Sequence, residues 1–285
     1  MTVRKIAAIT GTTHGIGRVT SRELARAGCA VVMLCRDLRG ATQLCDELTA
    51  LVPGAELHAV HCDLASLESV RRCAATVRRD FGRIDLLINN AGMVSTFQRR
   101  SPDGYELCFA TNHLGPFLLT RLLLDRIPAG GRIVNVASWV HYRARLDLAS
   151  VDASKTPYNA RQAYAQSKLA NVMFSFALAR RLAGYDVTVN CLHPGVVATH
   201  LLPRWLRAFY RLTRRPMIDA ERGAQTSLYL ALSEEVALLT GRYFDEHQRE
   251  QPASALARDV MQQERLWEAS ERWTDLPALS QLPVP

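Results

Sequence analysis

The sequence predicts an α/β fold in which helices cover both faces of a parallel sheet. Short β-branched segments alternate with longer helical ones, the short segments are continuously apolar, and no linker interrupts the chain. Continuously apolar strands are typical of sheets covered on both faces. The alternation implies parallel strands joined by right-handed crossovers, in a doubly wound sheet. Without a repeat, a charge block or a Pro/Gly/Ser-rich segment, we expect one domain over residues 1–285.

Strands are expected in the β-branched apolar segments, which are 5–10, 30–35, 57–61, 84–88, 132–137 and 187–192. Helical patterns lie between them, near 15–28, 39–51, 66–80, 103–126 and 159–183. Ser101 and Pro102 predict the start of the fourth helix, because serine caps a helix and proline suits its first position. Ligands of such sheets bind beyond the carboxyl ends of the strands, so functional residues are expected there.

Composition limits the class of protein. With 48% hydrophobic and 22% charged residues, the chain resembles a soluble globular protein that buries a sizeable core. Its seven cysteines are odd in number and lack CxxC spacing, which suits free thiols in a reducing compartment. The N-terminus runs directly into the first strand, and no stretch of 18 uncharged apolar residues follows. We therefore expect a cytoplasmic protein without a transmembrane segment.

The formal charge of +8 raises the question of a nucleic-acid partner. The arginines are spread over helices, and zinc-finger spacing, RNP-like aromatic motifs and basic heptads are all missing from the sequence. We expect no nucleic acid as the main partner. No cluster of His, Cys, Asp and Glu has the spacing of metal ligands, so we expect no metal either.

A glycine-rich turn follows the first predicted strand. The segment TGTTHGIG places Gly11, Gly15 and Gly17 before the first helix. Glycine permits a tight turn and lets a pyrophosphate approach the backbone at the positive end of the helix. The flanking strand and helix provide the context for a dinucleotide site, although the spacing is GxxxGxG rather than GxGxxG. The turn therefore predicts a Rossmann-type, dinucleotide-binding sheet.

The second strand ends LCRD, which bears on the choice of dinucleotide. An acidic residue here suits the ribose of NAD, whereas an arginine suits the 2′-phosphate of NADP. Arg36 stands here and Asp37 follows, with His14 and Arg18 adding positive charge from the turn. We favour NADP(H). In the alternative, with NAD(H), Arg36 is a solvated loop cation.

Residues 164–170 read YAQSKLA and place one of only three lysines four positions after a tyrosine. On a helix, Tyr164 and Lys168 would share a face. Either a half-buried tyrosine lies near a solvated lysine, or the ammonium makes the phenol acidic enough for proton transfer. A tyrosine pKa is ordinarily about 10, and nearby cations favour the phenolate.

With these segments placed, the sequence resembles a short-chain dehydrogenase/reductase nearly from end to end. TGTTHGIG matches the family's TGxxxGIG, NNAG at 89–92 matches its motif after the fourth strand, and Tyr164 with Lys168 matches YxxxK. A closer resemblance is to the retinol dehydrogenase-like branch. It rests on CRD, NHLGPF, AYAQSKLAN, GAQTSLYLALSEEVALLTGRYF and the 25 residues between Ser138 and Tyr164.

The resemblance implies a catalytic set of Ser138, Tyr164, Lys168 and Asn112. Tyr164 would donate a proton to a carbonyl oxygen to which Ser138 also hydrogen-bonds. Lys168 would bind the nicotinamide ribose and, together with an oxidised nicotinamide, lower the pKa of Tyr164. Asn112 would hold a water that passes protons between Lys168 and solvent.

The resemblance also implies the cofactor contacts. Asp63 and Leu64 match the pair that holds the adenine, and Pro194 and Gly195, followed by Thr199, match the segment against the nicotinamide. The predicted cofactor residues are Gly11, Thr13, His14, Gly15, Ile16, Gly17, Arg36, Asp63, Leu64, Asn90, Ala91, Gly92, Tyr164, Lys168, Pro194, Gly195, Val197 and Thr199.

The predicted domain divides into a cofactor half at about 1–135, a catalytic and substrate half at about 136–275, and a tail at 276–285. Many eukaryotic members of the branch begin with a membrane anchor, which this sequence does not show. By analogy with the family, we expect a homo-oligomer.

The segment 204–215, RWLRAFYRLTRR, interleaves aromatic residues with arginines in the helical substrate-loop region. On a helix, Trp205, Phe209 and Leu212 would share a face. This face either packs over the substrate pocket or makes a peripheral membrane contact that collects a lipophilic substrate.

The function predicted from the sequence is an NADP(H)-dependent oxidoreductase that interconverts a carbonyl and an alcohol on a hydrophobic small molecule. The alternative is a non-catalytic dinucleotide-binding or sensing module, which would be expected to have a broken catalytic set. A third class, a nucleic-acid or membrane-surface protein, would rely on the basic charge. Hydrolase chemistry is disfavoured, because the serine near His141 is not in a GxSxG elbow. Tyr142 and Tyr158 lack a lysine four residues on.

Overall fold

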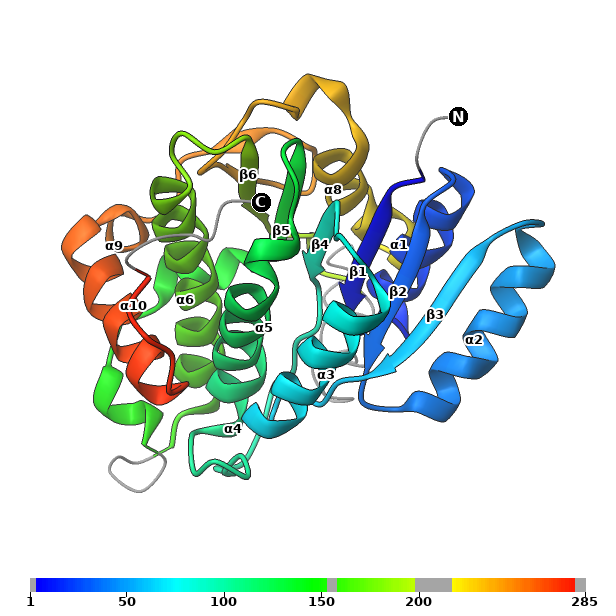
Figure 1. Cartoon of the computed structure of the whole chain (residues 1–285). Helices are drawn as coiled ribbons and strands as arrows, with labels where there is room; N and C mark the ends of the chain where they lie inside the picture. Colours follow the sequence, from blue (N-terminus) through cyan, green and yellow to red (C-terminus); the bar gives the residue numbers. More distant parts are fainter. Residues whose placement is uncertain (1–3, 153–157, 198–216, 280–285) are drawn as a thin grey trace.

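One eight-stranded sheet runs through the protein, with the strand order β3-β2-β1-β4-β5-β6-β7-β8 (Figure 1). The computed structural model describes residues 4–152, 158–197 and 217–279. The strands are β1 (Ile6–Thr10), β2 (Ala30–Cys35), β3 (Glu56–His61), β4 (Leu86–Asn89), β5 (Gly131–Val136), β6 (Val187–Leu192), β7 (Tyr243–Phe244) and β8 (Glu250–Gln251). Neighbouring strands from β3 to β7 pair in parallel, and β8 pairs antiparallel with β7. The predicted doubly wound sheet is confirmed.

Helices cover both faces of this sheet. The long ones are α1 (Gly15–Arg26), α2 (Leu38–Leu51), α3 (Leu67–Asp80), α5 (Gly115–Leu123), α6 (Ala160–Arg181), α8 (Ala220–Leu232) and α10 (Val260–Trp273). The short ones are α4 (Leu107–Phe109), α9 (Ala255–Arg258), the π-helical η1 (Ala110–Leu114), and the 3-10 segments η2 (Leu124–Arg126), η3 (Trp139–Arg143), η4 (Leu148–Val151) and η5 (Glu234–Val236).

Alternate residues of each strand point to opposite faces and so build two separate cores. Ala8, like its counterparts in the neighbouring strands, joins a cluster with side chains of α3, α5 and α6. Ala7 joins the other cluster, with side chains of α1, α2 and α8. Because both faces are buried, the strands could be recognised from the sequence as continuous apolar segments.

The start of the fourth predicted helix was wrong. Ser101 and Pro102 begin a turn, in which Gly104 N donates to Ser101 O at 3.0 Å and Gly104 has a φ of +88°. The helix begins at Leu107, where the Glu106 carboxylate caps it by accepting from the Cys108 and Phe109 amides. Tyr105 pairs with Asp152 in an isolated bridge, and this tertiary contact replaces the first predicted helical turn.

The helical stretch Leu107–Arg126 is the one segment among the described residues that is long and apolar enough to cross a membrane. In its most apolar window, 83% of the residues are buried inside the fold. Phe117, Leu118 and Leu119 lie in the core on the α3, α5 and α6 face of the sheet. The segment is therefore packed as a core helix.

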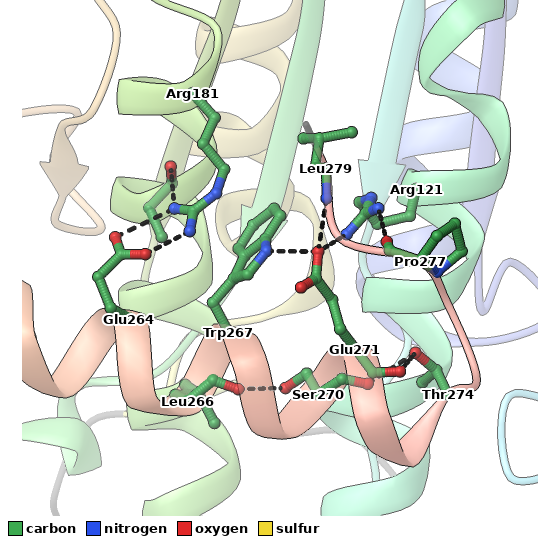
Figure 2. A network of polar contacts seen from close by, with 11 residues as sticks. Arg121, Arg181, Glu264, Leu266, Trp267, Ser270, Glu271, Thr274, Pro277 and Leu279 are labelled. Atoms are coloured by element: carbon green, nitrogen blue, oxygen red, sulfur yellow. Dashed lines mark hydrogen bonds and ion pairs between the residues drawn. The ribbon is translucent and has the colours of Figure 1, made fainter. Parts of the chain in front are cut away.

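The C-terminal helix α10 forms a further layer outside α5 and α6 (Figure 1). A buried ion pair joins Arg121 of α5 to Glu271 of α10 at 2.5 Å, with side chains only 5% and 10% exposed. The Glu271 carboxylate also accepts from Trp267 Nε1 and from Leu279 N, and Arg121 donates to Pro277 O (Figure 2). The first part of the predicted tail, 276–279, is thus hydrogen-bonded to α5 and α10. The remainder, 280–285, lies outside the described residues.

Candidate active site

The glycine turn between β1 and α1 packs tightly against the loop after β4. Gly11 has a φ of +71°, and a Cβ placed on it would lie 2.8 Å from Ala91 Cα. A Cβ on Gly17 would overlap the Gly11 carbonyl oxygen. These two positions require glycine, because any larger residue would force the turn and the loop apart.

Thr10 and Asn90 hold these two segments together. The Asn90 side-chain amide donates to Thr10 O at 2.9 Å and to Gly11 O at 3.1 Å. The backbone amides of Asn90 and Ala91 both donate to Thr10 Oγ1 at 3.0 Å. The predicted cofactor residue Asn90 thus shapes the glycine turn with its side chain.

The turn fits the phosphates of a dinucleotide. The first turn of α1 carries no acidic side chain, so the positive end of the helix is not neutralised from within. Thr13 and His14 lie side by side, with 2.9 Å between Thr13 Oγ1 and His14 Nδ1. A Cβ on Gly223 of α8 would contact both Ile16 and Val197, so these two predicted residues meet near this turn.

Arg36 and Asp37, which follow β2, differ in their contacts. Arg36 is exposed, whereas the Asp37 carboxylate caps α2 by accepting from Gly40 N at 3.0 Å. Arg18 is paired with Glu47 at 2.5 Å. The Asp37 carboxylate, which lies near the predicted position of the ribose, is therefore already hydrogen-bonded. The Arg36 side chain is exposed at the end of β2.

Asp63 and Leu64 follow β3. The Asp63 carboxylate accepts from Ala65 N at 3.0 Å, which fixes the turn that presents the pair. Leu64 is buried, and a Cβ on Gly115 would overlap its carbonyl oxygen. The start of α5 therefore packs directly against this predicted adenine-binding turn.

Ser138, Tyr164 and Lys168 come together at the carboxyl edge of the sheet. Ser138 follows β5, while Tyr164 and Lys168 project from α6. Lys168 Nζ donates to Val136 O at 2.8 Å, lies 5.9 Å from the centre of the Tyr164 ring, and would be 3.2 Å from a Cβ on Gly92. A continuous set of contacts therefore leads from the glycine turn, through Ala91 and Gly92, to this group.

Burial shifts the pKa values of Tyr164 and Lys168 in opposite directions, because both neutral forms are favoured. Burial raises the pKa of the Tyr164 phenol, the Cys108 thiol raises it further, and interaction with the Ser138 hydroxyl lowers it. Burial lowers the pKa of Lys168 to about 8, against a smaller effect of Cys108. The sequence predicted an acidic phenol. Among the groups of the protein itself, the loss of hydration raises the pKa of Tyr164 by more than Ser138 lowers it. The proton therefore stays on the tyrosine.

Asn112 lies in the π-helical η1, and its side chain is fully engaged. Its Oδ1 accepts from Met93 N at 2.7 Å, and its Nδ2 donates to Met93 O and to Ser167 Oγ at 2.9 Å each. The side-chain amide joins the loop after β4 to α6, and the water that the resemblance implies at this residue stays a prediction. Ser167, which precedes Lys168 in YAQSK, was not predicted.

The segment with Pro194 and Gly195 follows β6 and is held by His193. His193 Nε2 lies 2.7 Å from a Glu246 carboxylate oxygen, and its Nδ1 accepts from Gly195 N at 3.1 Å. Gly195 has a φ of +82°. Val197 pairs with Ile218 in a bridge. Thr199 and the segment 204–215 lie outside the described residues.

The competing tyrosines and histidines have structural partners. Tyr158 Oη donates to Ser95 O and Tyr142 Oη donates to Pro252 O, at 2.7 Å each. His113 is buried beside Ser270 of α10, and burial lowers its pKa to about 3. Within 4–152, 158–197 and 217–279, no three His, Cys, Asp or Glu side chains gather as metal ligands would.

Comparison with known proteins gives consistent matches. A family model described as short chain dehydrogenase matches residues 5–207. Retinol dehydrogenase 13 of Homo sapiens is 39% identical over 293 residues, which cover 99% of this chain and 88% of the relative. The crystal structure of an uncharacterized protein from Mycobacterium paratuberculosis has a TM-score of 0.78 at 34% identity, covering 95% of this chain and 94% of that one. An NAD(P) dependent gluconate 5-dehydrogenase structure from Beutenbergia cavernae, with NADP bound at low occupancy, has a TM-score of 0.69 at 28% identity, covering 85% and 94%.

Proposed function

This chain belongs to the short-chain dehydrogenase family, in its retinol dehydrogenase-like branch, and we propose that it interconverts an alcohol and a carbonyl with NADP(H). The observation that best supports this proposal is the meeting of Ser138, Tyr164 and Lys168 at the sheet edge that also bears the glycine turn. A catalytic set that is complete counts against the alternative of a sensing module.

We propose that residues 1–135 mainly bind the cofactor and 136–275 mainly bind the substrate and catalyse the reaction. The preference for NADP(H) over NAD(H) is supported by the exposed Arg36 and by the capping role of Asp37. The relative from Beutenbergia cavernae, which holds NADP, is in keeping with this preference. The remaining predicted contacts, from Gly11 through Thr199, belong to the same proposal.

When bound, the nicotinamide supplies the hydride. Tyr164 keeps its proton at neutral pH, because burial raises its pKa, and it donates this proton to the substrate oxygen during reduction. The Ser138 hydroxyl donates a hydrogen bond to the same oxygen and stabilises its developing charge. Below its pKa of about 8, Lys168 is cationic and favours the tyrosinate during alcohol oxidation. Asn112 fixes Met93 and Ser167 beside this group.

We propose a lipophilic substrate, in keeping with the name of the human relative, retinol dehydrogenase 13. We also propose the cytoplasm as its compartment, since all seven cysteines are free thiols and six are buried. Fractionation of cells tests the compartment, and a protein found only in an oxidising compartment would contradict it. The expected homo-oligomer stays a prediction that sedimentation can test.

The function is tested with Tyr164→Phe and a panel of retinoid, steroid, lipid and aromatic aldehydes and ketones, followed by NADPH absorbance. We expect kcat to fall by at least about 100-fold, because only the proton donor is lost. NADPH affinity should change by less than about twofold. Tyr158→Phe is the matched control. It loses the bond to Ser95 O, which contributes about 1 kcal/mol to stability, and the interaction of its hydroxyl with the Glu106 side chain, and it should keep its turnover.

Two outcomes contradict the proposal. Full turnover by Tyr164→Phe would remove the tyrosine from the chemistry. A wild-type protein that binds NADPH and reduces nothing in the panel would favour the dinucleotide-sensing alternative.

A further inference from the structure

His141 hydrogen-bonds the backbone of the predicted catalytic serine. Its Nδ1 lies 2.8 Å from Ser138 O, and its backbone amide donates to the same oxygen at 3.2 Å. On the other side of the ring, Nε2 accepts from the backbone amide of Ser254 at 3.2 Å. The residue is only 1% exposed. It therefore joins the turn after β5 to the chain that enters α9.

These partners select one form of the imidazole. A backbone N–H can only donate, so Nε2 must be unprotonated to accept from Ser254. The single ring proton is then on Nδ1, where it is donated to the Ser138 carbonyl oxygen. Burial lowers the pKa of His141, with the charge of His193 acting in the same direction and the bond to Ser138 opposing both. The neutral ring with its proton on Nδ1 satisfies all of its contacts.

The ring is fixed between two tyrosines. Its centre lies 4.0 Å from that of Tyr142 and 4.7 Å from that of Tyr243, which it meets edge to face. Ser254 caps α9 by accepting from Ala257 N at 3.2 Å. Ala257 packs in one core with Leu169, Ala170 and Met173 of α6. Through Ser254 and α9, His141 thus links the backbone of Ser138 to α6, the helix that carries Tyr164 and Lys168.

Apart from its interaction with the Tyr164 phenol, the Ser138 hydroxyl is weakly held within its own turn. Its hydrogen bond with Val140 N is 3.5 Å long, at the limit of a useful bond. The direction of the hydroxyl therefore depends on where the Ser138 backbone is placed.

We propose that His141 is a positioning residue, which holds the Ser138 carbonyl so that the Ser138 hydroxyl faces Tyr164 and the reacting oxygen. This inference rests on the proposed function, because Ser138 matters to turnover only if the enzyme reduces a carbonyl. A displacement of about 1 Å at such a group costs up to about 100-fold in rate.

Two substitutions of His141 distinguish the hydrogen bond made by Nδ1 from the one made by Nε2. In His141→Asn, the amide nitrogen can stand near Nδ1 and still donate to Ser138 O. In His141→Gln, the longer amide reaches the place of Nε2 and accepts from Ser254 N but leaves Ser138 O without its side-chain donor. We expect kcat within about threefold of wild type for His141→Asn and at least about tenfold lower for His141→Gln. The KM for NADPH and the unfolding temperature should differ little between the two variants.

Tyr142→Phe is the control from the same turn. It loses the bond to Pro252 O but keeps the ring that packs on His141, and it should keep kcat. In a Ser138→Ala background, His141→Gln should lower the residual kcat by less than about twofold, because its effect runs through the serine.

Equal kcat values for the Asn and Gln variants would overturn the inference, as would a full additional loss in the Ser138→Ala background. A parallel fall of kcat, NADPH affinity and unfolding temperature in His141→Gln would make His141 a residue that only maintains the fold. A wild-type protein without turnover would instead refute the proposed function.

Discussion

At the scale of single residues, the active site is governed by loss of hydration. Tyr164 and Lys168 belong to one helix face and lie next to each other, and burial favours the neutral form of both. The tyrosine therefore retains its proton, while the lysine is an ammonium that loses its proton unusually easily. Such a pair suits a site that donates a proton in one direction and takes it back in the other.

Lys168 should make stability depend on pH. Its pKa is about 8 in the folded protein and 10.5 in the unfolded chain, so between these values only the unfolded state holds the proton. Stability therefore rises with pH across this window, and below pH 8 the charged group costs about 3 kcal/mol. Lys168→Met removes this cost but leaves Val136 O without its donor, a loss of about 1 kcal/mol.

We expect Lys168→Met to be about 2 kcal/mol more stable than wild type at pH 7 by denaturant unfolding, and inactive. The gain should vanish near pH 10. Lys5→Met, at an exposed lysine, should leave the pH dependence unchanged. A Lys168→Met protein that is less stable than wild type at pH 7 would show that the ammonium is not destabilising where it lies.

Arg36 should discriminate between the two dinucleotides. Loss of a charge-assisted bond to the 2′-phosphate costs about 1.5–3 kcal/mol, so Arg36→Ala should weaken NADPH binding by about 10- to 100-fold and leave NADH binding nearly unchanged. Fluorescence titration with both cofactors measures this. Arg39→Ala, at an exposed arginine in the first turn of α2, is the control. Equal losses of affinity for both cofactors would mean that Arg36 does not bind the 2′-phosphate.

At the scale of elements, strands and helices were predictable where the pattern was long. The six predicted strands and the helices near 15–28, 39–51, 66–80 and 159–183 are confirmed within about two residues at most ends. Strands β7 and β8 have two residues each, too few for any periodicity to appear. The helix start at Leu107 could not be predicted from local sequence, because the residue before its Glu106 cap, Tyr105, pairs in a bridge with Asp152, which is distant in sequence.

The docking of α10 should depend on the buried pair of Arg121 and Glu271. Glu271→Ala leaves the guanidinium buried without a carboxylate, which costs about 3–5 kcal/mol of unfolding free energy. Glu264→Ala is the control on the same helix. Glu264 pairs with Arg181 and is 38% exposed, so its loss should cost no more than about 1 kcal/mol. Similar losses in both variants would mean that burial of the first pair does not determine its contribution.

At the scale of the whole molecule, one sheet joins the two proposed halves, 1–135 and 136–275. Strand β5, which lies almost wholly in the first half, pairs with β6 of the second, and Ser138 follows β5. The prediction of a single domain is confirmed, and so is the predicted class, an alcohol or carbonyl oxidoreductase of the short-chain dehydrogenase family.

The site was predictable where a motif fixes a residue on a known element, as for Tyr164 and Lys168 on one helix. Three features were not. The pKa of Tyr164 depends on burial by the whole fold, the Asn112 amide is engaged by a distant loop, and His141 reaches Ser254, 113 positions further along the chain. Each depends on contacts between segments that local spacing does not relate.

The position of α10 also bears on how the protein is made. Trp267 packs against Phe117 and Phe174, and Arg71 in α3 donates to Thr274 O, so residues from the last part of the chain complete a core begun by the first. During synthesis, this aromatic surface stays open to water until α10 has left the ribosome. A polypeptide cut short before α10 should therefore expose Phe117 and Phe174 and become a target for chaperones and proteases.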